Sequence, residues 1–131
     1  MKVFQNKRMK KPIQMIETAD LDILKSHFET ITFSSEFDLV YEKQIPNIGI
    51  ILVDGGIDLL NKRNHIELKS PGSILGLQNL LNNIPLKFKC RVKKNSQLIL
   101  LPKSEIMKIL DEKTSDLYKI IFPTDDKKLA G

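Results

Sequence analysis

The chain has 131 residues, of which 41% are apolar and 28% are charged, so it is long enough for one ordinary domain with its own core. It contains one cysteine and no apolar run of the ~18–20 residues that a transmembrane helix requires, which excludes an internal disulfide and a helical membrane span. The charged N-terminus is not followed by the apolar stretch of a secretory signal, so we expect a cytoplasmic protein.

The net charge of +5 is concentrated at the N-terminus. Five basic residues and no acidic residue precede Pro12, and the remaining 16 basic residues balance the 16 acidic residues of the chain. We therefore expect residues 1–11 to form a basic flexible arm. This arm is either a solvated terminus or a tether to an acidic surface on a partner protein, a nucleic acid or a lipid.

The segment TADLDILKSHFETI has the features of an amphipathic helix. Leu21, Leu24 and Phe28 recur at helical spacing, and acidic residues in the first turn favour the helix dipole. Thr18 can supply the N-terminal cap. These features predict a helix over residues 20–29.

Between residues 31 and 102 the pattern changes to short runs rich in Ile, Val, Leu and Phe. The runs are ITF, LVYE, IGIILV, IDLLN, HIELK, KFKCRV and QLILLP, and the turn signals between them are IPN, DGG, NKRN, SPGS and KKNS. Seven or eight short strands so close together predict a small antiparallel sandwich or barrel and not a βαβ sheet. The intervening segment SILGLQNLLNNIP could contain one helical turn.

Pro102 ends the last of these runs, and Ser104 can cap a second helix. Apolar residues then follow one stripe, which Lys113 interrupts: Ile106, Leu110, Leu117, Ile120 and Ile121. We predict one helix over residues 104–122 and a disordered tail over residues 123–131.

This order of elements resembles the cyclic nucleotide-binding domain family. IGIILVDGGIDLL resembles its paired strands with Gly55 at the turn, and IELKSPGSILG and SQLILLPKSEIMKIL resemble the strands before the ligand site and before the last helix. LGLQNLLNNIP resembles its phosphate-binding cassette, with Gly76 at the cassette glycine and Pro85 near the end. The resemblance covers residues 21–110. It implies a mainly β fold with flanking α-helices, an antiparallel β-roll or jelly-roll (double-stranded β-helix), in one cyclic nucleotide-binding-like domain over residues 12–122.

The resemblance also identifies the ligand positions of the cassette. In the family, a glutamate after the glycine binds the ribose and an arginine after the proline pairs with the cyclic phosphate; alignment on Gly76 and Pro85 places Leu77 and Leu86 there. Lys87 follows, but its ammonium is a flexible point charge and not a planar fork. Two missing hydrogen bonds to charged groups, together roughly 3–6 kcal/mol, correspond to two to four decades in affinity. The resemblance therefore implies a degenerate cassette that does not bind cAMP or cGMP in the family manner, and we expect no cofactor.

The strand after the cassette alternates between apolar and basic residues. The apolar set, expected to face the interior of the roll, comprises Leu86, Phe88, Cys90 and Val92. The basic set, expected to face outward, comprises Lys87, Lys89, Arg91 and Lys93. We expect Leu77, Leu86 and Phe88 to converge where the family holds its nucleotide. The basic face is either a solvated sheet face or a docking surface for an acidic partner or a polyphosphate, and it lacks the exposed aromatic residues of an RNA-binding face.

The sequence contains no recognisable catalytic or metal-binding motif. G-x-x-x-x-G-K-[ST], G-x-S-x-G and H-E-x-x-H are absent, and neither His27 nor His65 has a cysteine or carboxylate cluster at metal-ligand spacing. We therefore expect no catalytic residue, no metal site and no enzymatic activity.

Three functions fit this pattern. The first is a stand-alone degenerate cyclic nucleotide-binding-like domain that acts as a signalling or protein-interaction module, with an acidic protein as one kind of partner. The second is a sensor of a cyclic mono- or dinucleotide, bound in a non-standard way through Lys87, Lys89, Arg91 and the backbone amides of the cassette. The third is nucleic-acid binding through the arm. A homodimer through residues 104–122 is a separate hypothesis.

Overall fold

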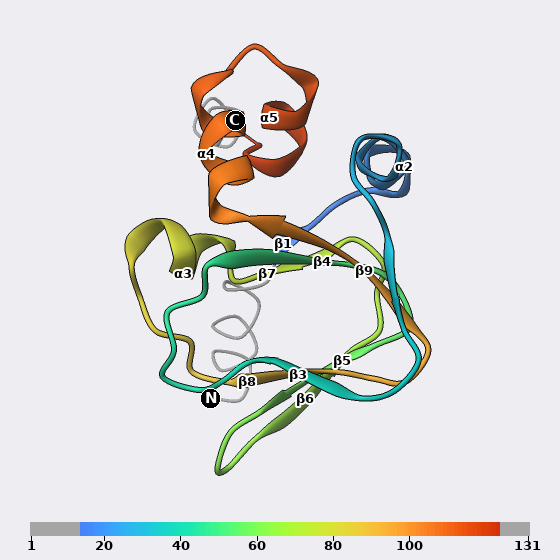
Figure 1. Cartoon of the computed structure of the whole chain (residues 1–131), viewed down its shortest axis with the longest axis vertical. Helices are drawn as coiled ribbons and strands as arrows, with labels where there is room; N and C mark the ends of the chain where they lie inside the picture. The colour runs from blue at the N-terminus through green and yellow to red at the C-terminus, as the bar shows by residue number, and fades with distance from the viewer. Residues whose placement is uncertain (1–13, 124–131) are drawn as a thin grey trace, which may run out of the picture.

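The computed structural model describes residues 14–123, which form nine short strands and four helices (Figure 1). The strands are β1 (Gln14–Met15), β2 (Ile31–Phe33), β3 (Phe37–Val40), β4 (Ile48–Asp54), β5 (Ile57–Leu60), β6 (His65–Leu68), β7 (Ser73–Leu75), β8 (Lys89–Val92) and β9 (Ser96–Pro102). The helices are α2 (Thr18–His27), α3 (Leu77–Asn82), α4 (Lys103–Asp111) and α5 (Asp116–Ile121). The expected arm and all of the expected tail except Pro123 lie outside the described residues.

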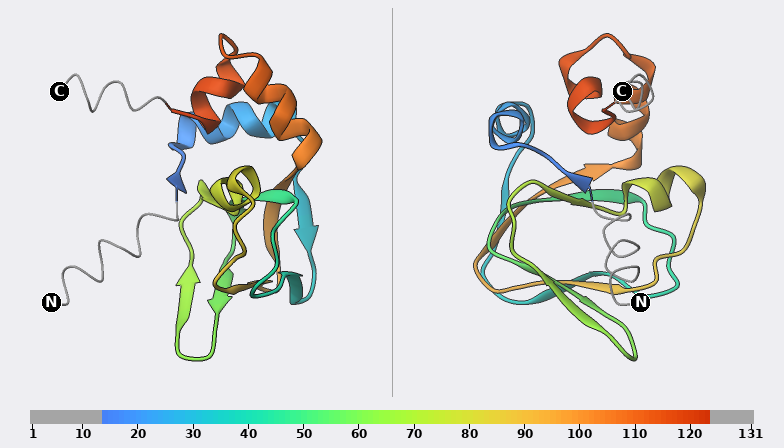
Figure 2. Two further views of the ribbon diagram at one scale, coloured as in Figure 1. Left: turned by 90° about the vertical axis from the view of Figure 1, so that its left-hand side faces the viewer. Right: turned by 180° about the vertical axis from the view of Figure 1, so that it is seen from behind.

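The strands form two antiparallel sheets that face each other. The large sheet has five strands in the order β1-β7-β4-β9-β2, and the small sheet has four in the order β3-β8-β5-β6. Helices α2, α4 and α5 lie over the large sheet, on the side away from the small sheet (Figures 1 and 2). The mainly antiparallel β-roll with flanking helices is therefore confirmed. No helix within residues 14–123 has the length and apolar character needed to cross a membrane.

The first hydrophobic core, here called the roll core, fills the space between the two sheets. Its buried members are Val40, Ile50, Leu52, Ile57, Leu59, Leu75, Cys90, Val92 and Leu98. Cys90 is 1% exposed, and burial raises the pKa of its thiol to about 12, so the thiol stays protonated at neutral pH. The side chain thus packs as a small apolar residue inside the roll, as expected from the alternation of its strand.

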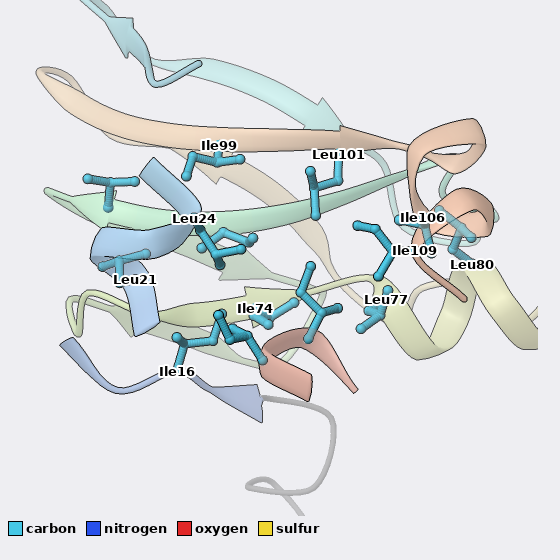
Figure 3. Close-up of a cluster of buried hydrophobic side chains, with 14 residues drawn as sticks. Ile16, Leu21, Leu24, Ile74, Leu77, Leu80, Ile99, Leu101, Ile106 and Ile109 are labelled. Carbon is cyan, nitrogen blue, oxygen red and sulfur yellow. The ribbon is translucent and has the colours of Figure 1, made fainter. Parts of the chain in front are cut away.

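The second core, here called the helix-side core, lies between the large sheet and the helices (Figure 3). Residues that contribute to it include Leu24 from α2, Ile51 from β4, Ile99 from β9, Ile106 from α4 and Ile121 from α5. Successive residues of β4 and β9 point into the two cores in turn. This is why these strands read as unbroken apolar runs and not as an apolar–polar alternation.

The predicted single helix over residues 104–122 is wrong. The chain forms α4, leaves the helical conformation at Glu112, and restarts as α5. The hydroxyl oxygen of Ser115 accepts a hydrogen bond from the N–H of Tyr118 at 3.1 Å and so caps the new helix. Because of the break, two separate helices contribute isoleucines to the helix-side core: Ile106 and Ile109 from α4, and Ile120 and Ile121 from α5.

The other end points differ by smaller amounts. Helix α2 begins at Thr18 and ends at His27, two residues before the expected bounds at each end, and Glu17 takes the cap position that we expected for Thr18. Ser104 likewise lies within the first turn of α4 behind Pro102 and does not cap it. Two short strands of the large sheet, β1 and β7, were not among the expected runs, whereas a helical turn within the cassette segment was considered and is present as α3.

Candidate functional site: the cassette and the adjoining sheet face

The cassette is a short helix held between two left-handed residues. Gly76 has φ +81°, a conformation that residues with a side chain rarely adopt, and it turns the chain from β7 into α3. Asn83 ends the helix with φ 55°. The side-chain amide of Asn79 then donates hydrogen bonds of 3.1 Å to the carbonyls of Ile84 and Pro85. These bonds fix the loop that leads out of the cassette.

Leu86, the residue after the cassette proline, is held in place through its backbone. Its N–H donates to the carbonyl of Gln44 at 2.9 Å, and its carbonyl accepts from the N–H of Lys43 at 2.8 Å. Its side chain is partly buried and packs against the roll core. Both backbone polar groups and the side chain of Leu86 are therefore used within the protein.

Leu77, at the other ligand position, lies in a different core. It is 3% exposed and belongs to the helix-side core, where Figure 3 shows it beside the helix residues. A methyl group added to Gly49 would lie 3.3 Å from Cδ1 of Ile106 and 4.0 Å from Cδ1 of Leu77, so these side chains meet over the same point of β4. The expected convergence of Leu77 with Leu86 and Phe88 is thus wrong, because α3 packs toward α4 and not into the roll.

The interior of the roll behind the cassette is apolar. The partly buried side chains that complete the roll core are Phe33, Leu39, Ile48, Ile66, Leu68, Leu86, Phe88 and Leu100. Within residues 14–123, no buried side-chain nitrogen or oxygen lacks a hydrogen-bond partner. The described interior therefore presents no polar side chain that a ribose or a phosphate would satisfy.

The outward basic residues of β8 are mostly paired with carboxylates of neighbouring strands. Arg91 Nε donates to Oδ1 of Asp38 at 2.7 Å, and Lys89 Nζ lies 3.6 Å from the other carboxylate oxygen. The Arg91 hydrogen bond holds the pKa of the Asp38 carboxyl below its usual value, with a smaller contribution from the Lys89 charge. The same bond raises the pKa of Arg91. Asp38 thus neutralises part of the basic face.

The strand register explains this pairing. Across β3, β8, β5 and β6 it places four charged residues in one row: Asp38, Arg91, Asp58 and Glu67. Asp38 and Asp58 flank Arg91 in this row with opposite charge, whereas Asp58 and Glu67 face each other with like charge. Lys93 Nζ pairs with Glu67 and lies 3.9 Å from Oδ1 of Asp58, and the Glu67 hydrogen bond raises the pKa of Lys93. His65 Nε2 lies 3.0 Å from the same Asp58 oxygen.

Lys87 differs from the other three basic residues. It is exposed and makes no ion pair with any residue between 14 and 123. Of the basic set, Lys87 is therefore the charge that this face presents to solvent without a described counter-ion. The same range contains no cluster of three or more His, Cys, Asp and Glu side chains that could bind a metal ion.

Two exposed aromatic residues lie beside the basic face and were missed in the sequence. Phe37 and Tyr41 are 55% and 53% exposed, and Lys89 Nζ lies 5.6 Å from the centroid of the Tyr41 ring. Two shallow depressions share Tyr41: one is lined by Tyr41, Glu42, Leu60, Asn61 and Lys89, and the other by Glu36, Phe37, Asp38, Tyr41 and Arg91. The pairing of β3 with β8 brings these aromatic residues next to the basic face. The two strands are about 50 residues apart in the chain, and no local pattern indicates that they pair.

Removal of the Asp38 carboxylate is expected to destabilise the protein in a pH-dependent way. Because the folded pKa of Asp38 is lowered, its ion pairs stabilise the folded state above the usual pKa of 3.8, and this contribution is lost as the pH falls through the folded value. We expect Asp38→Ala to reduce the free energy of unfolding by about 1 kcal/mol at neutral pH. Urea unfolding at decreasing pH should show the two proteins converging as the pH falls below about 4.

The control for this experiment is Asp22→Ala. Asp22 pairs with Lys25 at 3.7 Å on the exposed side of α2, so its removal should change the free energy of unfolding by less than about 0.5 kcal/mol. Equal losses in the two variants, or a difference from wild type that persists at the lowest pH, would contradict the role given to Asp38.

Comparisons with known proteins relate the fold to solved structures. No family model and no curated protein sequence matches the chain. A structure from a cyclic-GMP-dependent signalling pathway that regulates bacterial phytopathogenesis matches 89% of this chain and 97% of its own, with a TM-score of 0.67 at 17% identity. PKAR CBD2 bound to Sp-2Cl-cAMPS matches 87% of this chain and 76% of its own, with a TM-score of 0.57 at 14% identity.

Catabolite Activator Protein from Thermus thermophilus matches 73% of this chain, with a TM-score of 0.55 at 14% identity. The match spans about half of that protein, 47% of its length. At identities of 14–17%, the likeness to these three structures concerns the fold. The chain therefore has the fold of the cyclic nucleotide-binding domains.

Proposed function

We propose that this chain is a signalling module that acts by contact with another protein, catalyses no reaction and does not bind cAMP or cGMP in the manner of the family whose fold it shares. The observation that supports this proposal is the packing of the two cassette positions. Leu77 is buried in the helix-side core and Leu86 packs against the roll core, so each position contributes to stability. A ligand in the usual pose would have to displace packed leucine.

The energetics support the same proposal. A cyclic phosphate moved from water to a site walled by leucine loses its hydration without gaining a paired cation, which carries a penalty of several kcal/mol. The missing ribose and phosphate contacts remove roughly 3–6 kcal/mol more. Together these terms are comparable with the ~8 kcal/mol that corresponds to a micromolar dissociation constant.

The second candidate, a sensor with a non-standard pose, is favoured by one part of the sheet face. Lys87 is exposed directly after the cassette, and the Tyr41 ring beside Lys89 offers a stacking surface and a cation. A phosphate on this face would compete with Asp38 for Lys89 and Arg91. This face is therefore a weaker anion site than its count of basic residues suggests.

A thermal-shift series with the full chain tests both candidates. We expect no stabilisation by cAMP, cGMP or cyclic dinucleotides, whereas a ligand present at 100 times its dissociation constant would stabilise the folded state by about 2.7 kcal/mol. The matched variants are Lys87→Ala and Lys113→Ala, two exposed lysines without an ion pair among residues 14–123. Stabilisation that is lost only in Lys87→Ala would support the sensor, and stabilisation that both variants retain would contradict both candidates.

A further inference from the structure

One side of the roll ends in an open strand edge. β2 is the outermost strand of the large sheet and pairs only with β9, and β3 is the outermost strand of the small sheet and pairs only with β8. The two strands follow each other in the chain, so they form one ribbon that passes from the upper sheet to the lower sheet (Figure 1). We call residues 29–42 the β2–β3 edge.

This edge is apolar and acidic. Three of its large apolar side chains are exposed, to 38%, 55% and 53%: Ile31, Phe37 and Tyr41. Three of its carboxylates are exposed and form no ion pair with any residue between 14 and 123: Glu29, Glu36 and Glu42. No lysine or arginine occurs from residue 29 to residue 42. The edge therefore lacks the lysines with which proteins commonly protect an open strand, and it presents unpaired backbone groups beside apolar and negative side chains.

A basic extended segment with apolar residues complements such an edge, and the chain contains one. We propose that the N-terminal arm, residues 1–11, of a second copy binds the β2–β3 edge as an added strand. The arm carries five basic residues and no acidic residue, and Val3, Phe4 and Met9 supply apolar side chains. Its positive charges face the three carboxylates without a described counter-ion, and its apolar residues cover the exposed aromatic rings.

The position of β1 favours a second copy, over the same molecule, as the source of the arm. The arm joins the described structure at β1, which lies at the opposite edge of the large sheet from β2. Four strand spacings of about 4.8 Å separate the two edges by about 19 Å, and the roll core and the helices cover the two faces between them. The described residues therefore begin on the far side of the molecule from the β2–β3 edge. Eleven extended residues reach about 36–40 Å, so an arm that first crosses this width keeps roughly half of its length for pairing, whereas the arm of a neighbour can pair along its whole length.

Sedimentation of the full chain over a range of concentration and salt tests this proposal. We expect concentration-dependent self-association that weakens with added salt, because exposed ion pairs are screened. Charge reversal in the arm (Arg8→Glu, Lys10→Glu and Lys11→Glu) or on the edge (Glu36→Lys and Glu42→Lys) should each weaken association at least about tenfold. Combination of the two sets should restore most of the loss, since the opposite charges then face each other again.

The matched control is Asp111→Lys with Glu112→Lys, which makes the same charge change at two exposed residues at the end of α4, away from the edge, and should leave association unchanged. Hydrogen exchange should show protection of residues 31–40 that rises with protein concentration. A monomer at every concentration, association insensitive to both charge-reversal sets, or protection of the edge in a monomer would each overturn the proposal; the last result would place the arm on its own chain.

Discussion

Replacement of Gly55 by alanine is expected to reduce the free energy of unfolding by about 3 kcal/mol or more. Gly55 has φ +93°, and a Cβ there would lie 2.3 Å from Oγ and 2.7 Å from Cα of Ser96. This figure is the sum of backbone strain, about 1–2 kcal/mol, and overpacking, about 1–3 kcal/mol. Ser96 would also have to move, which would disturb two hydrogen bonds. Its hydroxyl accepts from the N–H of Gly56 at 2.9 Å and donates to the carbonyl of Gly56 at 3.1 Å.

The neighbouring glycine provides the control for this result. A Cβ on Gly56 would meet Cδ of Lys93 at 3.0 Å, the flexible part of a side chain that can move aside, and the backbone oxygen of Leu68 at 3.3 Å, which needs a shift of only a few tenths of an ångström. We expect Gly56→Ala to change the free energy of unfolding by about 1 kcal/mol or less. Urea unfolding of the two variants gives the comparison. Similar stabilities would show that the left-handed turn between β4 and β5 can relax, contrary to the contacts described above.

The second large effect is expected for Ile106→Ala. Ile106 is 0% exposed and lies where α4, the cassette helix and β4 meet, beside Leu77 and above Gly49. Loss of this side chain leaves a cavity that three elements share, and a reduction of about 3–4 kcal/mol in the free energy of unfolding follows from comparable core substitutions. Calorimetry or urea unfolding measures this change.

Met107→Ala, one residue further along α4, is the matched control. Met107 is 43% exposed, so its truncation should change the free energy of unfolding by no more than about 0.5 kcal/mol. A small effect of Ile106→Ala, close to that of Met107→Ala, would mean that α4 is not anchored to the sheet through Ile106.

The packing of α4 and α5 also bears on the predicted dimer. Ile106 and Ile120 of the predicted stripe are buried within the chain, and Leu110 and Leu117 are partly buried. A homodimer through residues 104–122 stays a prediction, but its contacts would have to come from the exposed residues of this segment, such as Met107 of α4 and Lys119 of α5.

Features that depend on local pattern could be predicted from the sequence. The alternation from Leu86 to Lys93 placed Phe88, Cys90 and Val92 inside the roll because side chains of a strand alternate between its two faces. The possible helical turn in SILGLQNLLNNIP, with Gly76 before it and Asn82 and Asn83 at its end, corresponds to α3, which left-handed Gly76 and Asn83 bound.

Features that depend on distant residues could not be predicted in the same way. Asp38 and Arg91 are 53 residues apart, and only the register of β3 with β8 shows that the basic face is largely neutralised. The direction of α3, and with it the location of Leu77, depends on where α4 packs. The restart of the helix after the break is marked by one hydroxyl cap at Ser115. In the sequence, this single cap is a weaker signal than the apolar stripe around it, which predicts a continuous helix.

The sharing of β4 and β9 between the two cores has a consequence for how the molecule responds to stress. Detachment of the helical layer would bring Ile51, Ile99 and Leu101 into water on the very strands that hold the roll together. Separation of the layers therefore costs much free energy, and heat or denaturant should unfold both layers in a single cooperative step. A partner that pulls on α4 or α5 would strain both the cassette and the roll. The whole domain is therefore one mechanical unit.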